Sequence, residues 1–336
     1  MKWYRLLALG FLTCTLQAQA APAQLNGAGS TFIYPVFSQW AASYHQKTGN
    51  QINYQAIGSG GGIRQISQGT VDFAATDAPM TADELAKEKL VQFPMIMGGI
   101  IPTINVPGIK ANELRLDGET LAAIFAGKIT SWDDARIKSL NPSLTLPALR
   151  ITVVHRADGS GSTWILTNYL SKVSASWKQN IGTGKSVKWP TGVGAKGNDA
   201  VANYVKRIKG GIGYVELAYV LQNNMTSVLL KNRAGHFVAP TLANLKAAAA
   251  NADWLNTPGF AVILTDQPGA DSWPITGATF MLMHAPVMAE RNQVLRDFFT
   301  WSWNEGSAKA EELAYVPLPA SLVKTIKASW SDKGSK

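Results

Sequence analysis

A glycine-rich turn that joins a strand pattern to a helix pattern has the greatest bearing on the fold of this chain. Residues 52–56 alternate between apolar and polar side chains, as in a strand, and lead directly into the glycine cluster at 58–62. A short helix is expected at 63–66, and the apolar run at 71–76 predicts the next strand. The order strand, glycine turn, helix, strand indicates an α/β sheet.

The same order recurs along the chain, with loops containing Pro and Gly near 141–147 and 189–197. Short apolar runs predict strands, and spacings of three and four residues predict helices. The expected segments are an apolar run at 95–106, a helix near 121–126, a strand at 151–155, a helix after Ser160, and strands at 213–216 and 278–283. These patterns predict an α/β fold over most of the chain.

Aromatic side chains indicate a packed helix near each end of the chain. Four of them recur at helical spacing and predict one buried face: Tyr34, Phe37, Trp40 and Tyr44. This first helix should end at residues 48–50. In the last forty residues, the aromatic-rich stretch at 298–303 predicts a packed helix, followed by a Pro-rich turn at 317–319.

The first twenty residues are typical of a secretory signal. Lys2 and Arg5 precede an apolar run at 6–16, and Ala18-Gln19-Ala20 matches an A-x-A cleavage site. The run is shorter than the roughly 20 apolar residues that a membrane span needs. We therefore expect a protein that is exported and is not embedded in a membrane.

Cleavage after Ala20 would remove Cys14, the only cysteine, and leave 336 − 20 = 316 residues. A 46% hydrophobic composition is then enough to stabilise two domains through buried cores. The formal charge of +9 becomes 9 − 2 = +7 without Lys2 and Arg5, which favours anionic partners. Because Lys and Arg are scattered along the chain, nucleic-acid binding is not expected.

Three segments place glycine and a hydroxyl residue where a strand or turn gives way to a helix: 27–32, 58–62 and 156–163. Free N–H groups and the positive end of the helix dipole attract anions at such a point. Glycine lets the backbone approach the anion, and Ser or Thr adds a hydroxyl donor. Each segment taken alone is also typical of an ordinary helix cap.

The third segment carries a cation beside its hydroxyl residues. Arg156 and Asp158 lie four and two residues before Ser160. A guanidinium can bind an oxyanion through two parallel hydrogen bonds, and a neighbouring carboxylate can hold the guanidinium in place. The alternative interpretation is a surface ion pair of little consequence.

Other ligand and enzyme classes lack their motifs in this chain. None of the glycine segments matches a P-loop or a dinucleotide-binding turn, and none of their serines lies in G-x-S-x-G. The histidines have neither metal-ligand nor catalytic-triad spacing. We therefore expect no catalytic residue, no metal and no cofactor.

At this point a family resemblance is visible over nearly all of the expected mature chain. The motifs that carry it are Gly27-Ala28-Gly29-Ser30-Thr31-Phe32, Ile57-Gly58-Ser59-Gly60-Gly61-Gly62, Asp72-Phe73-Ala74-Ala75-Thr76-Asp77-Ala78-Pro79, Arg156-Ala157-Asp158-Gly159-Ser160-Gly161, Lys196-Gly197-Asn198, Gly211-Ile212-Gly213-Tyr214-Val215-Glu216 and Trp273-Pro274-Ile275. The chain resembles the PstS family, the phosphate-binding proteins of bacterial phosphate-specific ABC transporters.

The resemblance implies a type II-like periplasmic-binding-protein fold, an α/β fold of two lobes. Each lobe would be a mixed sheet flanked by helices, and two crossover strands would join the lobes. After the signal peptide at 1–20, lobe I would comprise residues 21–97 and 275–336, and lobe II residues 98–274. The lobes would close on the ligand like a hinged trap.

The resemblance also implies the residues of a phosphate site. The expected phosphate-binding residues are Thr31, Phe32, Ser59, Asp77, Arg156, Ser160, Gly161 and Ser162, with Ser30 and Asp158 in support. The family usually has Thr where this chain has Ser162, so the hydroxyl is retained.

Asp77 is the unusual member of this set, because a carboxylate beside an anion is repulsive. Phosphate still carries a proton at neutral pH and can donate it to the carboxylate, whereas sulfate carries none. An unpaired, desolvated lone pair against sulfate would cost several kcal/mol, so Asp77 would determine selectivity. The alternative role for Asp77 is an ordinary helix N-cap after the strand.

The expected function is high-affinity binding of inorganic phosphate, in its mono- and dihydrogen forms, and delivery to an ABC permease and its ATPase by a monomeric receptor. Two alternatives stay open. One is a phosphate-ester hydrolase with a Ser nucleophile, and the other is an extracellular adhesion or scavenging protein that binds phosphate.

Overall fold

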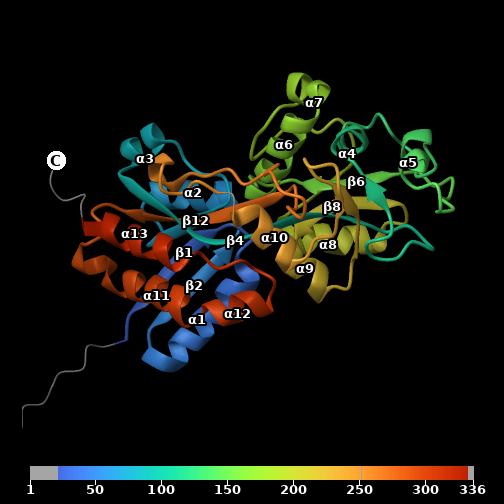
Figure 1. The fold of residues 1–336 in the computed structure, drawn as a ribbon. Coiled ribbons are helices and arrows are strands. Elements are labelled where there is room, and N and C mark those ends of the chain that lie inside the picture. Colours follow the sequence, from blue (N-terminus) through green and yellow to red (C-terminus); the bar gives the residue numbers. More distant parts are fainter. Residues whose placement is uncertain (1–21, 251, 332–336) are drawn as a thin grey trace, which may run out of the picture.

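The protein is described by a computed structural model that covers residues 22–250 and 252–331 (Figure 1). The expected signal peptide at 1–20, with Cys14, lies outside these residues. The strands are β1 (Gln24–Gly29), β2 (Gln51–Ala56), β3 (Phe73–Thr76), β4 (Leu90–Ile104), β5 (Arg115–Leu116), β6 (Thr152–Arg156), β7 (Val193–Ala195), β8 (Gly211–Glu216), β9 (Thr226–Ser227), β10 (Leu229–Lys231), β11 (Phe237–Val238) and β12 (Thr276–His284).

Helices alternate with these strands through most of the chain. They are α1 (Tyr34–Thr48), α2 (Ser59–Ser67), α3 (Ala82–Glu88), α4 (Gly118–Phe125), α5 (Ala135–Leu140), α6 (Gly161–Val173), α7 (Ala175–Asn180), α8 (Gly197–Arg207), α9 (Leu217–Gln222), α10 (Leu242–Ala250), α11 (Gln293–Asn304), α12 (Ser307–Glu312) and α13 (Ala320–Ser331). Two short 3₁₀ turns lie at Pro258–Phe260 and Glu290–Asn292.

The large sheet runs in the order β2-β1-β3-β12-β4-β8-β6-β7, and a small one in the order β11-β10-β5. Strand β1 is parallel to β2 and β3, whereas β12 is antiparallel to both β3 and β4. Strand β8 is antiparallel to β4 and parallel to β6. This mixed parallel and antiparallel arrangement confirms the predicted α/β class, with helices on both sides of the strands (Figure 1).

Strand β4 belongs to both ends of the large sheet. Its residues up to Gly99 pair with β12, whereas those from Ile100 onward pair with β8. Ile100 N–H donates to Ile275 O at 2.8 Å, so the chain returns beside β4 just before β12 begins. Two chain segments therefore cross between two α/β lobes, as the fold prediction requires, and Figure 1 shows the lobes side by side.

The expected segments form, with one difference in the first helix. Phe37, Trp40 and Tyr44 of α1 are buried as predicted, and the helix ends at Gly49 in the left-handed conformation (φ 77°). Tyr34, however, is 42% exposed. It is the first residue of α1, and its ring stacks on that of Tyr54, with ring centroids 6.4 Å apart.

The end of the chain contains more helix than the sequence patterns indicated. The predicted packed helix is α11, and Phe298, Phe299 and Trp303 are buried in it. Helix α12 then precedes the Pro-rich turn, and α13 follows the turn. Within residues 22–250 and 252–331, no helix combines the length and apolar character needed to cross a bilayer.

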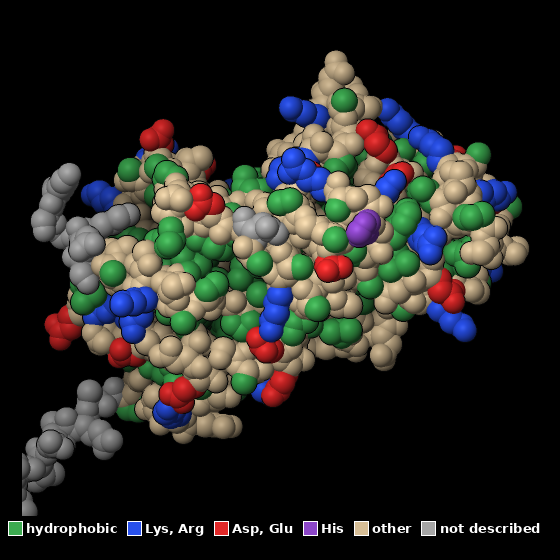
Figure 2. All heavy atoms as spheres, in the orientation of Figure 1, with side chains coloured by type: hydrophobic (Ala, Val, Ile, Leu, Met, Phe, Trp, Pro, Cys, Tyr) green, Lys and Arg blue, Asp and Glu red, His purple; other side chains and the backbone are tan. Residues whose placement is uncertain are grey.

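Charged side chains are dispersed over the surface in view. On the face in Figure 2, Lys and Arg are interspersed with Asp and Glu over both lobes. The excess positive charge of the sequence therefore does not form one continuous patch on this face.

Candidate functional site

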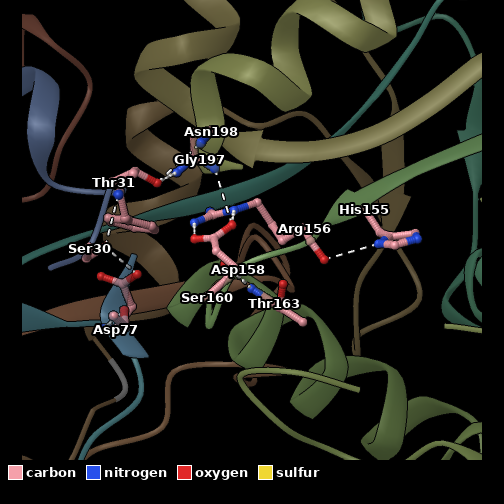
Figure 3. A network of polar contacts seen from close by, with 12 residues as sticks. Ser30, Thr31, Asp77, His155, Arg156, Asp158, Ser160, Thr163, Gly197 and Asn198 are labelled. Carbon is pink, nitrogen blue, oxygen red and sulfur yellow. Dashed lines mark hydrogen bonds and ion pairs between the residues drawn. The ribbon is translucent and has the colours of Figure 1, made fainter. Parts of the chain in front are cut away.

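The three predicted loops meet where the two lobes touch. Gly60 N–H, at the start of α2, donates to Gly159 O across the lobes at 2.8 Å. The Thr31 hydroxyl accepts hydrogen bonds from the N–H and the Nδ2 of Asn198, at 3.2 and 2.7 Å. Figure 3 shows Ser30, Thr31 and Asp77 on one side of this junction and Arg156, Asp158 and Ser160 on the other.

The first loop, between β1 and α1, is held in place mainly through its backbone. Ser30 N–H donates to Ala75 O at 2.9 Å, and Phe32 N–H donates to the Ser30 hydroxyl at 2.9 Å. The hydroxyl of Tyr315 donates to Phe32 O at 2.6 Å. Because the Thr31 hydroxyl only accepts from Asn198, its own hydrogen remains for a ligand.

The second loop delivers Ser59 to the N-terminus of α2. Gly58 has a φ of 89°, which glycine adopts without strain, and a Cβ there would lie 2.2 Å from Asp158 Oδ2. The Ser59 hydroxyl is fully buried and accepts from Asp77 N–H at 3.2 Å. The Ser59 hydroxyl also helps to lower the pKa of Asp77, and its hydrogen can turn from the carboxylate to a ligand.

Asp77 is buried at the end of β3 and is not a helix cap, because the cap of α3 is Thr81. The Ser30 hydroxyl donates to Asp77 Oδ2 at 2.6 Å, and the Thr279 hydroxyl donates to Oδ1 at 2.7 Å. Burial raises the pKa of Asp77 to about 6, although these hydroxyls and the charge of Arg156 act to lower it.

Arg156 and Asp158 form a buried ion pair rather than a surface one, with side chains only 2% and 12% exposed. Nε of Arg156 donates to Asp158 Oδ1 at 2.7 Å, and Nη2 donates to Oδ2. Burial acts to raise the pKa of Asp158, but Arg156 and the N–H of Gly197 lower it below its ordinary value. One edge of the guanidinium is thus held, and Nη1 is left for an anion.

The third loop ends in the N-terminus of α6. The Ser160 hydroxyl caps this helix by accepting from Thr163 N–H at 3.1 Å, as the cap interpretation predicts. The Ser162 hydroxyl is buried and has no hydrogen-bond partner. A Cβ on Gly161 would lie 2.4 Å from Asp77 Oδ2 and 2.5 Å from the Ser59 hydroxyl, so only glycine fits there.

The assembled site is a set of donors facing one buried carboxyl group. The hydroxyls with a hydrogen still to donate are Thr31, Ser59, Ser160 and Ser162. The first turns of α2 and α6 add free N–H groups, and Arg156 adds a cation. An oxyanion that can also donate one hydrogen bond matches this arrangement best.

Several residues at the site were not predicted. Tyr214 accepts from Arg156 N–H at 3.1 Å, and the Tyr219 hydroxyl donates to Thr31 O at 2.7 Å. Asn198 belongs to the motif Lys196-Gly197-Asn198, which predicts no particular role for its side chain. Thr279 belongs to the predicted strand at 278–283. Their partners are distant in the sequence, so only the folded chain identifies them.

The described part of the chain holds no group of three or more His, Cys, Asp and Glu residues suited to a metal ion. His155, the histidine beside the site, stacks on Trp189 with ring centroids 4.9 Å apart, and its Nδ1 lies 3.1 Å from Arg156 O.

Two α/β lobes with an oxyanion site between them define the class of two-lobed solute-binding proteins. Residues 16–305 match the model of the PBP superfamily domain. The chain belongs to the PstS family within this superfamily, which confirms the predicted membership.

Relatives named phosphate-binding protein PstS support this conclusion. The Xylella fastidiosa protein is 51% identical over 316 residues, which cover 94% of this chain and 87% of that protein. The Pasteurella multocida protein is 51% identical over 328 residues, covering 97% and 94%. The Methanocaldococcus jannaschii protein is 37% identical over 325 residues, covering 88% and 82%.

Solved structures share the fold at lower sequence identity. A phosphate-binding protein from Stenotrophomonas maltophilia has a TM-score of 0.69 and 19% identity, covering 92% of this chain and 94% of that one. A substrate-binding protein of a phosphate ABC transporter from Clostridium perfringens, with bound phosphate, has a TM-score of 0.65 and 17% identity, covering 88% and 100%.

Proposed function

We propose that this protein binds inorganic phosphate between its lobes and delivers it to an ABC permease. The observation that carries the proposal is the buried Asp77 carboxyl, which faces a ring of hydrogen-bond donors and the guanidinium of Arg156. The names of the relatives support the same ligand. The proposal includes no chemical step, no metal and no cofactor.

The proposed phosphate contacts come from both lobes. From lobe I they are Thr31, the backbone of Phe32, Ser59 and Asp77, and from lobe II they are Arg156, Ser160, Gly161 and Ser162. Ser30 and Asp158 act in support, because Ser30 holds Asp77 and Asp158 holds Arg156. The unpartnered Ser162 hydroxyl would gain a partner from a phosphate oxygen.

Asp77 would select for a protonated oxyanion. At neutral pH its carboxylate can only accept hydrogen bonds, and phosphate can donate one. Sulfate would instead place oxygen lone pairs against the carboxylate in a buried site. The anion would thus be recognised by its proton and not by its shape alone.

We propose that the lobes consist of residues 21–97 with 275–336 and of residues 98–274. The change of partner along β4, between Gly99 and Ile100, lies two residues after the first proposed boundary and supports it. The return of the chain at Ile275 supports the second. Rotation about these two segments would open and close the site.

The protein would act as a monomer in the periplasm, after removal of a signal peptide at residues 1–20. Its partners would be an ABC permease and its ATPase; it would bind no nucleic acid and would not be embedded in a membrane. The apolar and cationic pattern of the first twenty residues supports export.

Isothermal titration calorimetry on the mature chain tests the proposal. We expect tight binding of phosphate and little or no binding of sulfate. Arg156→Ala should weaken phosphate binding by at least about 3 kcal/mol, because it also leaves Asp158 as an unpaired buried charge. Arg136→Ala is the matched control, because Arg136 is half exposed on α5.

Equal loss of affinity in the two Arg variants would mean that only the overall charge matters. Phosphate and sulfate binding with the same affinity would contradict the role of Asp77. Turnover of an aryl phosphate would favour the hydrolase alternative instead.

A further inference from the structure

The sheet register places a hydroxyl residue from the far end of the chain beside Asp77. Strand β12 is antiparallel to β3, and Phe280 pairs with Thr76. Asp77 directly follows the last residue of β3, and Thr279 directly precedes Phe280 in β12. Their side chains meet, and the Thr279 hydroxyl lies 2.7 Å from Asp77 Oδ1.

The other oxygen of Asp77 has a donor that a second hydrogen bond holds in place. A serine hydroxyl has a single hydrogen. The Ser30 hydroxyl accepts from Phe32 N–H at 2.9 Å and donates this hydrogen to Asp77 Oδ2 at 2.6 Å. Reversing this bond would leave the hydrogen of the buried Ser30 hydroxyl in need of another acceptor, which is costly.

Thr279 is the donor to the first oxygen of Asp77, Oδ1. The Thr279 hydroxyl is fully buried, and its hydrogen bond runs to Asp77 Oδ1. With Asp77 ionised, both carboxylate oxygens accept from a hydroxyl. With Asp77 protonated on Oδ1, Thr279 would have to accept instead of donate. The pair of hydroxyls therefore favours the ionised carboxylate.

We propose that Thr279 is a positioning residue that sets anion specificity, because its hydroxyl keeps Asp77 an acceptor that only a proton-bearing oxyanion can satisfy. The inference rests on the proposed binding of phosphate at Asp77. Three residues would then determine anion selectivity together: Asp77, Ser30 and Thr279.

Other ionisable groups interact electrostatically with Asp77, and all the variants in the test retain these groups. The guanidinium of Arg156 lowers the pKa of Asp77. The charge of Asp77 in turn helps to raise the pKa of Glu216, Tyr54 and Tyr315, although burial is the main cause for each of the three. Burial therefore favours the neutral form of these three groups, and Arg156 is the cationic neighbour of Asp77.

The test compares two equivalent substitutions in one strand. Thr279→Val removes the donor to Asp77, and Thr276→Val removes an equally buried hydroxyl that donates to Trp273 O at 2.9 Å. Phosphate and sulfate affinities are measured by calorimetric competition from pH 5 to 9. In Thr279→Val we expect the sulfate-to-phosphate affinity ratio at pH 7 to rise about fivefold, if the pKa of Asp77 rises by about one unit from about 6.

The pH profile distinguishes this role from a structural one. As the pH is lowered, sulfate binding should begin at a higher pH in Thr279→Val than in the wild type or in Thr276→Val. Thr279→Ser keeps the hydroxyl and should restore the wild-type ratio and profile. Titration of the Asp77 carboxyl by carbon-13 NMR in the ligand-free protein should show the same order of midpoints.

The inference is overturned if Thr279→Val and Thr276→Val have the same affinity ratio and the same profile while the wild type rejects sulfate. A wild type that binds both anions equally, or neither, would instead overturn the proposed function. The two failures are therefore distinguishable.

Discussion

Asp77 shows at the scale of one residue how specificity opposes stability. Its pKa of about 6 lies above its ordinary value of 3.8 because the carboxylate is desolvated. The folded state therefore binds this proton more tightly than the unfolded state. The resulting stability is complete below pH 3.8 and is lost as the pH rises to about 6. The ionised carboxylate should lower the free energy of unfolding by roughly 3 kcal/mol at pH 7.

Asp77→Asn should accordingly stabilise the ligand-free protein at pH 7, since the amide is neutral and similar in shape. We expect a higher Tm than that of the wild type at pH 7, and a smaller difference as the pH falls towards 4. Differential scanning calorimetry over this pH range measures both. Asp83→Asn, on the exposed face of α3, is the control. A difference in Tm that does not change with pH would contradict the assigned cause.

At the scale of the element, the N-terminus of α2 meets the third loop through two glycines. A Cβ on Gly60 would lie 3.1 Å from the Cα of Gly159, and Gly60 N–H bonds Gly159 O across the lobes. Gly60→Ala should therefore hold the lobes apart and weaken phosphate binding about tenfold, roughly 1.4 kcal/mol. It should also raise Tm slightly, since Ala favours the helix over Gly.

Gly61→Ala is the matched control for this substitution, because its Cβ would approach only the half-exposed side chain of Ile57 in the same lobe. Stopped-flow measurement should show faster phosphate release from Gly60→Ala than from Gly61→Ala. Equal affinities of the two variants for phosphate would show that the glycine contact does not limit closure.

The elements that the sequence predicts are those with a local signal. The loops at 27–32 and 58–62 and the third loop carry their own glycines and hydroxyls, so motif and geometry coincide. Thr279 could not be assigned, because it reaches Asp77 only through the pairing of β12 with β3 across 202 residues. Asn198 could not be assigned either, since its role depends on contact between lobes.

Missed helices have a similar physical explanation, with one exception. Helix α10 is rich in alanine and so shows little apolar periodicity. Helix α13 did carry a signal, since Leu322, Ile326 and Trp330 recur every four residues and are buried. No helix was predicted after the Pro-rich turn at 317–319.

At the scale of the whole molecule, the contacts between lobes form a closed state that phosphate should stabilise. The pKa of Glu84 on α3 is lowered mainly by the hydrogen bond from Thr81 N–H. The positive charge of Lys185, from the other lobe, lowers this pKa further. Asn198 and Tyr219 contribute hydrogen bonds to Thr31 across the same junction. A ligand that bridges the lobes would add to these contacts and shift the population towards closure.

Energy transfer between two dyes can measure this shift, because cleavage after Ala20 would leave a mature chain without cysteine. Lys87→Cys on α3 and Lys178→Cys on α7 place the labels at exposed positions in different lobes. Phosphate should raise the transfer efficiency, and sulfate should not. Adding Arg156→Ala should abolish the response to phosphate, because one lobe would then lose its main contact with the anion. An efficiency that is high and unchanged by phosphate would mean that the free protein is already closed, and binding would then depend on spontaneous opening instead of ligand-driven closure.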